Sequence, residues 1–206
     1  MKRPVLAMVL LIAATVVVGC ATSPERVGQR LFAGCVDKVD DRASLANGMF
    51  VCDGERDPAP FGGNGRSCGD CHAPGDNFGI SAERIAALPT SHPIFAVGLE
   101  ENPTLMREHG LFRVIAPGTV DEFRQSPKLV HLQSMCDKNG TCDSLGLLGD
   151  RVNNLCVFSI EAIRNHMSKT TRREAGKDFE VPTSDECEAL VAYMLSDLVA
   201  DQDERN

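Results

Sequence analysis

The feature that most constrains this chain is a pair of cysteines separated by two residues, Cys68 and Cys71, followed immediately by His72. This spacing is typical of the attachment site of a c-type haem. The two thiols would form thioethers with the porphyrin vinyl groups, and His72 would bind the iron as the proximal ligand. A Cys-x-x-Cys pair alone also occurs in redox dithiols and zinc sites. The adjacent histidine, the lack of a second such pair in the sequence and an export signal favour one covalent haem c.

The first twenty residues are predicted to be that export signal. Lys2 and Arg3 precede an apolar run over residues 5–18, which is short for a membrane span and is typical of a signal peptide. The run ends at a small residue before Cys20, as in a bacterial lipoprotein signal, so Cys20 is predicted to carry lipid and begin the mature chain. An ordinary signal with a chance cysteine is the alternative. The lipid would anchor the protein in the cell envelope, and Ala21 favours the outer membrane, facing the periplasm.

The cysteine count predicts disulfides. The chain has nine cysteines, and six remain once lipid and haem have taken theirs. An even remainder in an exported protein implies disulfides. Short separations in sequence favour the pairs Cys35–Cys52, Cys136–Cys142 and Cys156–Cys187. Turn residues inside the second pair favour a small closed loop, whereas the third pair rests on elimination and on both cysteines lying at helix beginnings.

The periodicity of apolar residues predicts an all-α fold, a cytochrome c-like haem domain with long disulfide-stapled loops. The predicted helices cover residues 24–34, 82–88, 103–112 and 155–170, with a last helix after the capping box that begins at Thr183. No strand pattern of any length is found, and an extended stretch over 127–135 is expected to pass the haem edge. The predicted organisation is a signal peptide (1–20), an N-terminal helix and disulfide loop (21–60), the rest of the haem domain (61–200) and a disordered tail (201–206).

The function of a haem protein depends on the sixth iron ligand, because a second strong ligand leaves electron transfer while an open site permits oxygen or peroxide chemistry. The candidates are His166, Met167 and Met135. Phe158 and Ala162 precede His166 at helical spacing, which indicates an inward-facing stripe. The residues alone leave these alternatives open.

Four segments resemble haem domains of the bacterial cytochrome c peroxidase superfamily. Residues 26–32 and 61–72 resemble the opening of such a domain, and residues 127–132 resemble its Pro-x-Leu-x-Asn-Leu segment, with His131 in place of the usual Asn. Residues 158–166 resemble a helix of that family whose final residue is the distal ligand. The resemblance therefore implies His166 as the distal iron ligand, with Met135 or Met167 as alternatives. Peroxidases of that family carry two haem motifs and this chain has one, so an electron relay between two haems within the chain is not expected.

These features together predict a membrane-anchored, single-haem c-type cytochrome that carries electrons in the bacterial cell envelope, with no catalytic residue. The alternative is a haem enzyme or enzyme subunit, either peroxidase-like or the electron-accepting subunit of a periplasmic dehydrogenase. The formal net charge is −8, and the mature part is two units more negative because the signal holds two basic and no acidic residues. This charge disfavours nucleic acid and favours redox partners with basic docking patches.

Overall fold

The structure is a computed structural model, and it describes residues 23–42, 47–96, 98–114, 122–143, 145 and 153–200. The predictions on the signal peptide, on lipid at Cys20 and on the tail at 201–206 lie outside the described residues. Within the described ranges, no helix combines the length and the apolar character needed to cross a membrane.

The prediction of an all-α, cytochrome c-like fold is wrong, because helices and a small sheet occur together. The described residues form seven α-helices, four single-turn 3-10 helices and two strands. Strands β1 (Leu111–Val114) and β2 (Glu122–Gln125) pair antiparallel, with Phe112 opposite Arg124. Phe112 and Val114 are buried while the alternate residues of β1 are only partly so, as expected for a strand with one covered face. Each strand is four residues long, so the alternation is too brief to stand out in the sequence.

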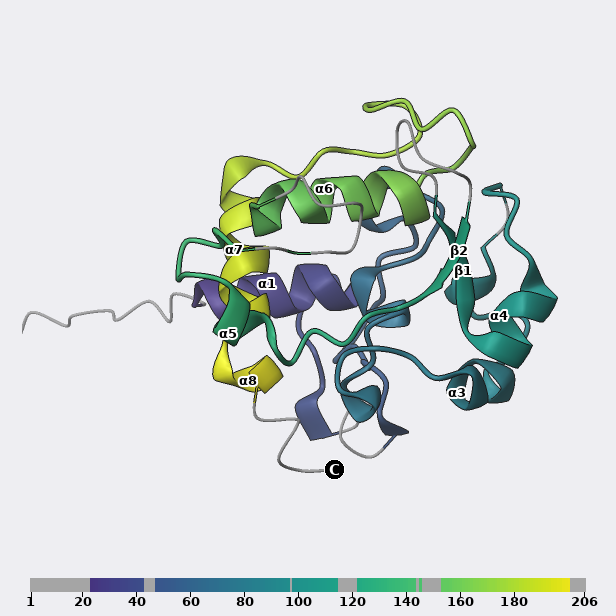
Figure 1. Cartoon of the computed structure of the whole chain (residues 1–206), viewed down its shortest axis with the longest axis horizontal. Coiled ribbons are helices and arrows are strands. Elements are labelled where there is room, and N and C mark those ends of the chain that lie inside the picture. Colours follow the sequence, from purple (N-terminus) through teal and green to yellow (C-terminus); the bar gives the residue numbers. More distant parts are fainter. Residues whose placement is uncertain are drawn as a thin grey trace, which may run out of the picture.

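Two crossing helices form one side of the molecule. Helix α1 (Pro24–Ala33) begins after the N-cap Ser23, and α7 (Ser184–Met194) begins with the predicted capping box of Thr183 and Glu186. The two helices pack against each other (Figure 1). A Cβ at Gly28 would lie 1.9 Å from the carbonyl oxygen of Ala189, so the close crossing requires glycine at this position.

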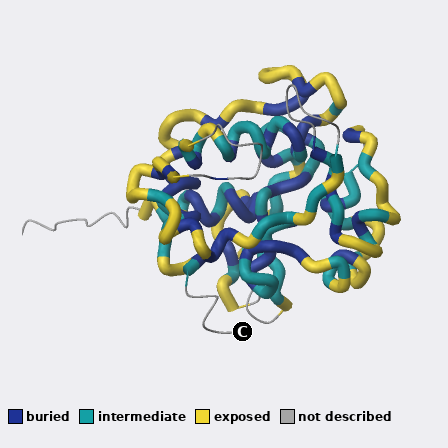
Figure 2. Tube along the Cα trace, in the orientation of Figure 1, coloured by how far each residue is buried: buried dark blue, intermediate teal, exposed yellow. Residues whose placement is uncertain are grey.

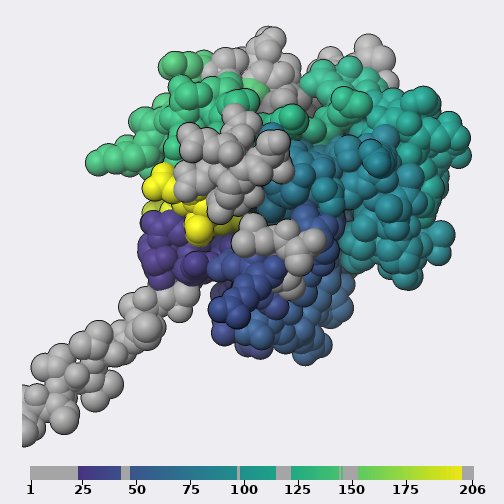
Figure 3. Space-filling model, turned by 90° about the horizontal axis from the view of Figure 1, so that it is seen from below, coloured from purple at the N-terminus to yellow at the C-terminus, as the bar shows by residue number. Residues whose placement is uncertain are grey.

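The other helices surround this pair. Helix α6 (Leu155–His166) lies along the top of Figure 1 and contacts α7, while α3 (Ala82–Ala87) and α4 (Pro103–His109) pack together on the opposite side, next to β1. Seen from below in Figure 3, the teal region of α3 and α4 forms the right-hand side of the surface, and the purple region of α1 lies on the left. Two short helices, α5 (Leu132–Met135) and α8 (Asp197–Ala200), complete the set.

Several predicted boundaries need correction. The stretch predicted to be extended as far as residue 135 ends in the helical turn α5. Helix α6 ends at His166 rather than at 170, and the last helix is divided into α7 and α8. Helix α4 ends at His109 because Gly110 adopts the left-handed conformation, and β1 begins directly after it.

The three predicted disulfides are confirmed. Cys35–Cys52 closes the loop after α1, Cys136–Cys142 closes a short loop after α5, and Cys156–Cys187 joins α6 to α7. Within the described part of the chain, Cys68 and Cys71 are the cysteines left without a disulfide partner.

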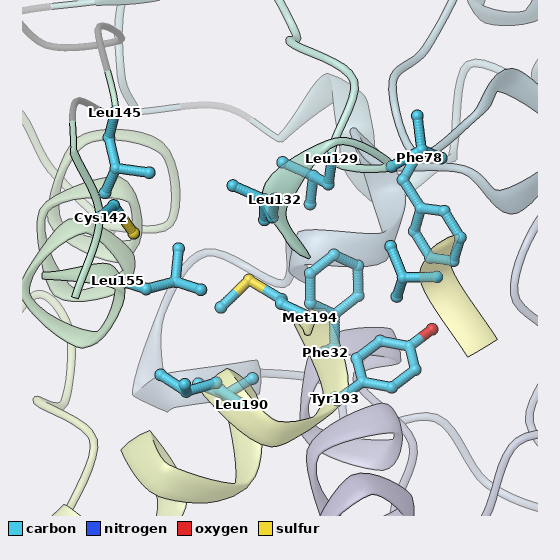
Figure 4. Close-up of a cluster of buried hydrophobic side chains, with 13 residues drawn as sticks. Phe32, Phe78, Leu129, Leu132, Cys142, Leu145, Leu155, Leu190, Tyr193 and Met194 are labelled. Carbon is cyan, nitrogen blue, oxygen red and sulfur yellow. The ribbon is translucent and has the colours of Figure 1, made fainter. Parts of the chain in front are cut away.

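Buried residues run through the centre of the molecule and exposed ones cover its outer loops (Figure 2). The largest buried cluster joins α1, α6, α7 and the segment around α5. In it, Phe32 packs edge-on against Tyr193, with ring centroids 5.3 Å apart. Figure 4 shows Leu132, Leu155 and Met194 converging on a common space from three different elements. That space belongs to the candidate site.

Candidate cofactor site

An apolar cavity lies between α6, the β1–β2 sheet and the segment that leads into α5. Cys68, Cys71 and His72 line it together with His166 and Met167, which lie almost a hundred residues later in the chain. Most of the remaining wall is apolar, including Phe32, Leu129, Leu132, Leu155, Phe158 and Met194. The fold thus brings the Cys-x-x-Cys-His motif and the end of α6 to one cavity.

The two residues between the cysteines fold the motif into a single 3-10 turn, Cys68–Asp70. The buried Asp70 carboxylate accepts a hydrogen bond from the Ser67 backbone N–H at 2.7 Å and pairs with Arg56 at 2.5 Å. A Cβ at Gly69 would lie 2.5 Å from the Phe50 ring, so a larger residue would not fit there. Asp70 and Gly69 therefore hold the turn in which both thiols reach the same cavity.

The ring of His72 is oriented by hydrogen bonds. Its Nδ1 lies 2.8 Å from the carbonyl oxygen of Phe78 and 3.2 Å from the Ser126 hydroxyl. Because a carbonyl can only accept, Nδ1 carries the proton and Nε2 is left with a lone pair, which is the form that binds a metal. Burial lowers the pKa of His72, although the bonds to the Phe78 and Pro127 carbonyls oppose this, and the ring is neutral at pH 7.

His166 is the last residue of α6 and lies on the wall of the same cavity. Its imidazole makes no hydrogen bond with any residue that the structure describes. Burial lowers the pKa of His166 to about 3, and the positive charges of Arg66 and Arg173 act in the same direction. A second neutral imidazole is therefore available to bind a metal from this wall.

The other candidate ligands divide into two groups. Met167 follows His166 and also lines the cavity, as does Met194, a buried residue of α7. Met135 is 39% exposed at the end of α5, and His131 is exposed at its beginning; neither lines the cavity. The structure brings His72 together with His166 and Met167, and it does not bring Met135 to this site.

Sequence reasoning missed the partners of Arg66. The Arg66 side chain is 1% exposed and pairs with the buried Glu101 at 2.8 Å. It also donates to the carbonyl oxygen of Ile94. Glu101 follows 35 residues later in a loop, and no local sequence signal connects the two. A second arginine on the cavity wall, Arg124, comes from the sheet that the sequence did not reveal.

Comparison of the chain with protein-family models, curated proteins and solved structures finds no match. Among the described residues, no three His, Cys, Asp or Glu side chains are grouped so that they could hold a metal ion by themselves.

The donor set nevertheless fits a covalent haem, whose porphyrin supplies four of the iron ligands. Two unpaired thiols lie beside a neutral imidazole with a free Nε2, and a second neutral imidazole lies on the same apolar cavity. Burial raises the pKa of the Cys68 and Cys71 thiols to about 12, so both are protonated at neutral pH. A redox dithiol needs a reactive thiolate, and these protonated thiols lack one.

Proposed function

We propose that this chain holds one covalent haem c in the cavity and carries single electrons. Cys68 and Cys71 are the attachment residues, His72 is the proximal ligand and His166 is the distal ligand. The observation that carries the proposal is the meeting of two unpaired thiols and two neutral imidazoles on one apolar cavity. The bound haem would supply a reversible one-electron couple at its iron.

The protein's own groups would fix the ligands and keep water away. The Phe78 carbonyl holds Nδ1 of His72, so that Nε2 remains available for the iron. His166 would be the second protein ligand of the iron, which favours an electron carrier over an enzyme that binds a substrate at the metal. Two imidazole ligands favour a lower reduction potential than a His–Met pair, since thioether ligation raises it.

The setting in the cell follows from the N-terminal sequence. Lipid on Cys20 would tether the domain in the bacterial envelope, at the outer membrane and facing the periplasm. The strongly negative chain would be steered towards redox partners that carry basic docking patches. A haem enzyme or dehydrogenase subunit remains the second reading, and it requires a distal position that opens to small ligands.

The test is to produce the full chain in a host competent for cytochrome c assembly, then to stain denaturing gels for haem and record visible spectra. We expect covalent haem with low-spin spectra in both oxidation states, and its loss in the Cys68→Ser/Cys71→Ser double variant. A colourless wild-type protein, or one with zinc between the two thiols, would overturn the proposal.

Two further variants test the distal ligand. His166→Ala should give a high-spin iron that binds carbon monoxide rapidly. Met135→Ala is the matched control, and its spectrum should equal that of the wild type because Met135 lies off the cavity. A wild-type protein that is already high-spin would favour the enzyme reading.

A further inference from the structure

The end of α6 is held by the segment that leads into the Cys-x-x-Cys-His motif. The side-chain amide of Asn64 and the guanidinium of Arg66 each donate to the carbonyl oxygen of His166, at 3.2 Å. The backbone N–H of Asn64 donates to the carbonyl oxygen of Met167 at 2.8 Å. A Cβ at Gly63 would lie 2.1 Å from that same oxygen, so the two segments are in close contact.

These bonds have a specific effect on a helix end. The last carbonyls of a helix have no partner within the helix and carry its partial negative charge. Here a buried cation and an amide donate to the carbonyl of the very residue whose side chain lies on the cavity wall. We refer to Asn64 and Arg66 as the carbonyl clamp.

The clamp is itself rigidly held. Arg66 is fixed by the carbonyl of Ile94 and by the carboxylate of Glu101, whose other oxygen accepts from the Arg113 backbone N–H of β1 at 2.9 Å. Because Arg66 comes two residues before Cys68, its position is tied to that of the motif. The clamp therefore connects the segment that carries His72 directly to the residue that faces it.

We propose that Asn64 and Arg66 are positioning residues that select His166, rather than the adjacent Met167, as the distal ligand. The side chains of His166 and Met167 both line the cavity. Successive residues of a helix differ by about 100° in direction, so a rotation of the helix end by about that angle would exchange the two. This proposal rests on the proposed haem site and concerns the choice of ligand within it.

The test compares Asn64→Asp with wild-type holoprotein by visible spectroscopy and by the rate of cyanide binding. The aspartate keeps the acceptor for the Arg66 backbone N–H but loses the donor to the His166 carbonyl. Losing one such bond should raise the population without His166 on the iron by about tenfold. If that population has an open iron site, cyanide should bind faster. If Met167 has replaced His166, the far-red charge-transfer band of a Met-ligated ferric haem should appear. In the second case Asn64→Asp/Met167→Leu should abolish the band.

Two variants of arginine complete the design. Arg66→Lys keeps the charge and a donor, so it should show a smaller change than Asn64→Asp. Arg164→Ala removes a cation from the same end of α6, where it pairs with Glu161, and should leave spectrum and binding rate unchanged. Haem-loaded, low-spin Asn64→Asp protein that matches the wild type in both measurements would refute the clamp alone, whereas colourless wild-type protein would refute the haem site.

Discussion

The two histidines of the candidate site are held in opposite ways. The imidazole of His72 is bonded through Nδ1 to the Phe78 carbonyl and lies beside the Ser126 hydroxyl. The imidazole of His166 has no such bond among the described residues, and its backbone carbonyl is held instead by Asn64 and Arg66.

This difference shows two routes to a defined ligand position. A hydrogen bond on the ring fixes its tautomer and its rotation directly. A bond on the carbonyl fixes only the backbone, and the ring must then be oriented by the helix and by the walls of the cavity. The loss of one hydrogen-bonding neighbour should therefore disturb the position of the His72 ring less than that of the His166 ring.

The largest expected effect separates the two histidines themselves. His72→Ala should lower the yield of haem-loaded protein by about tenfold or more, because the proposed function makes His72 both an iron ligand and part of the attachment motif. His166→Ala should keep the wild-type yield and change only the spectrum, since both thiols and His72 remain. Haem-stained gels at equal protein loading measure the yield. If both variants lost haem to the same extent, the two sides would not differ as described.

The next effect concerns the buried ion pair behind the distal side. Arg66→Ala would leave the Glu101 carboxylate buried without its cation, at a cost of about 3–5 kcal/mol in the free energy of unfolding. Glu101→Gln keeps an acceptor for Arg66 and should cost less, about 1–3 kcal/mol. Urea unfolding at pH 7 provides both values. Equal losses in the two variants would show that the charge of Glu101 accounts for the whole effect, contrary to this expectation.

The features that the sequence predicted are those with local signals. The start of α1, the capping box of α7 and the three disulfides each depend on residues close in sequence or on a cysteine count. The position of His166 on the wall of the cavity followed from the periodicity of α6 and from the family resemblance.

The features that were missed depend on contacts between distant segments. The four-residue strands β1 and β2 gain stability only by pairing with each other, and each alone gives too short an alternation to recognise. The burial of Arg66 likewise depends on a loop glutamate and a backbone carbonyl far along the chain. Met135 was considered as a ligand because its segment was expected to be extended, but α5 leaves it exposed.

A smaller effect tests the tolerance of the proximal side. The Ser126 hydroxyl donates to the carbonyl oxygen of Cys71 at 2.6 Å, and Ser126→Ala should cost about 1 kcal/mol in unfolding free energy. The low-spin spectrum should persist, because the Phe78 carbonyl still holds Nδ1 of His72. Ser134→Ala, at an exposed hydroxyl of α5, is the control and should change stability by less than about 0.5 kcal/mol. A high-spin Ser126→Ala protein would mean that the ring depends on both neighbours.

The smallest expected effect lies in the loop that carries the Phe78 carbonyl. Burial acts to raise the pKa of Asp76, but hydrogen bonds from Arg84 and Ser81 outweigh it and lower this pKa below 3.8. A folded-state pKa below the unfolded one means that the ionised carboxylate stabilises the fold above about pH 4, and that this contribution disappears as pH falls through the folded-state pKa. Asp76→Asn should therefore cost about 1 kcal/mol at pH 7 and progressively less below pH 4.

Urea unfolding of wild type and Asp76→Asn between pH 7 and pH 3 measures this difference, with Glu188→Gln on the exposed face of α7 as a control for loss of one negative charge. Asp76 accepts from Ser81 and pairs with Arg84 at 2.8 Å, and the Gly79 N–H donates to its carbonyl, so the residue closes the turn around Phe78. A contribution from the charged carboxylate must change with pH as Asp76 takes up a proton. A stability difference that stayed constant with pH would therefore show that Asp76 acts through the shape of the turn alone.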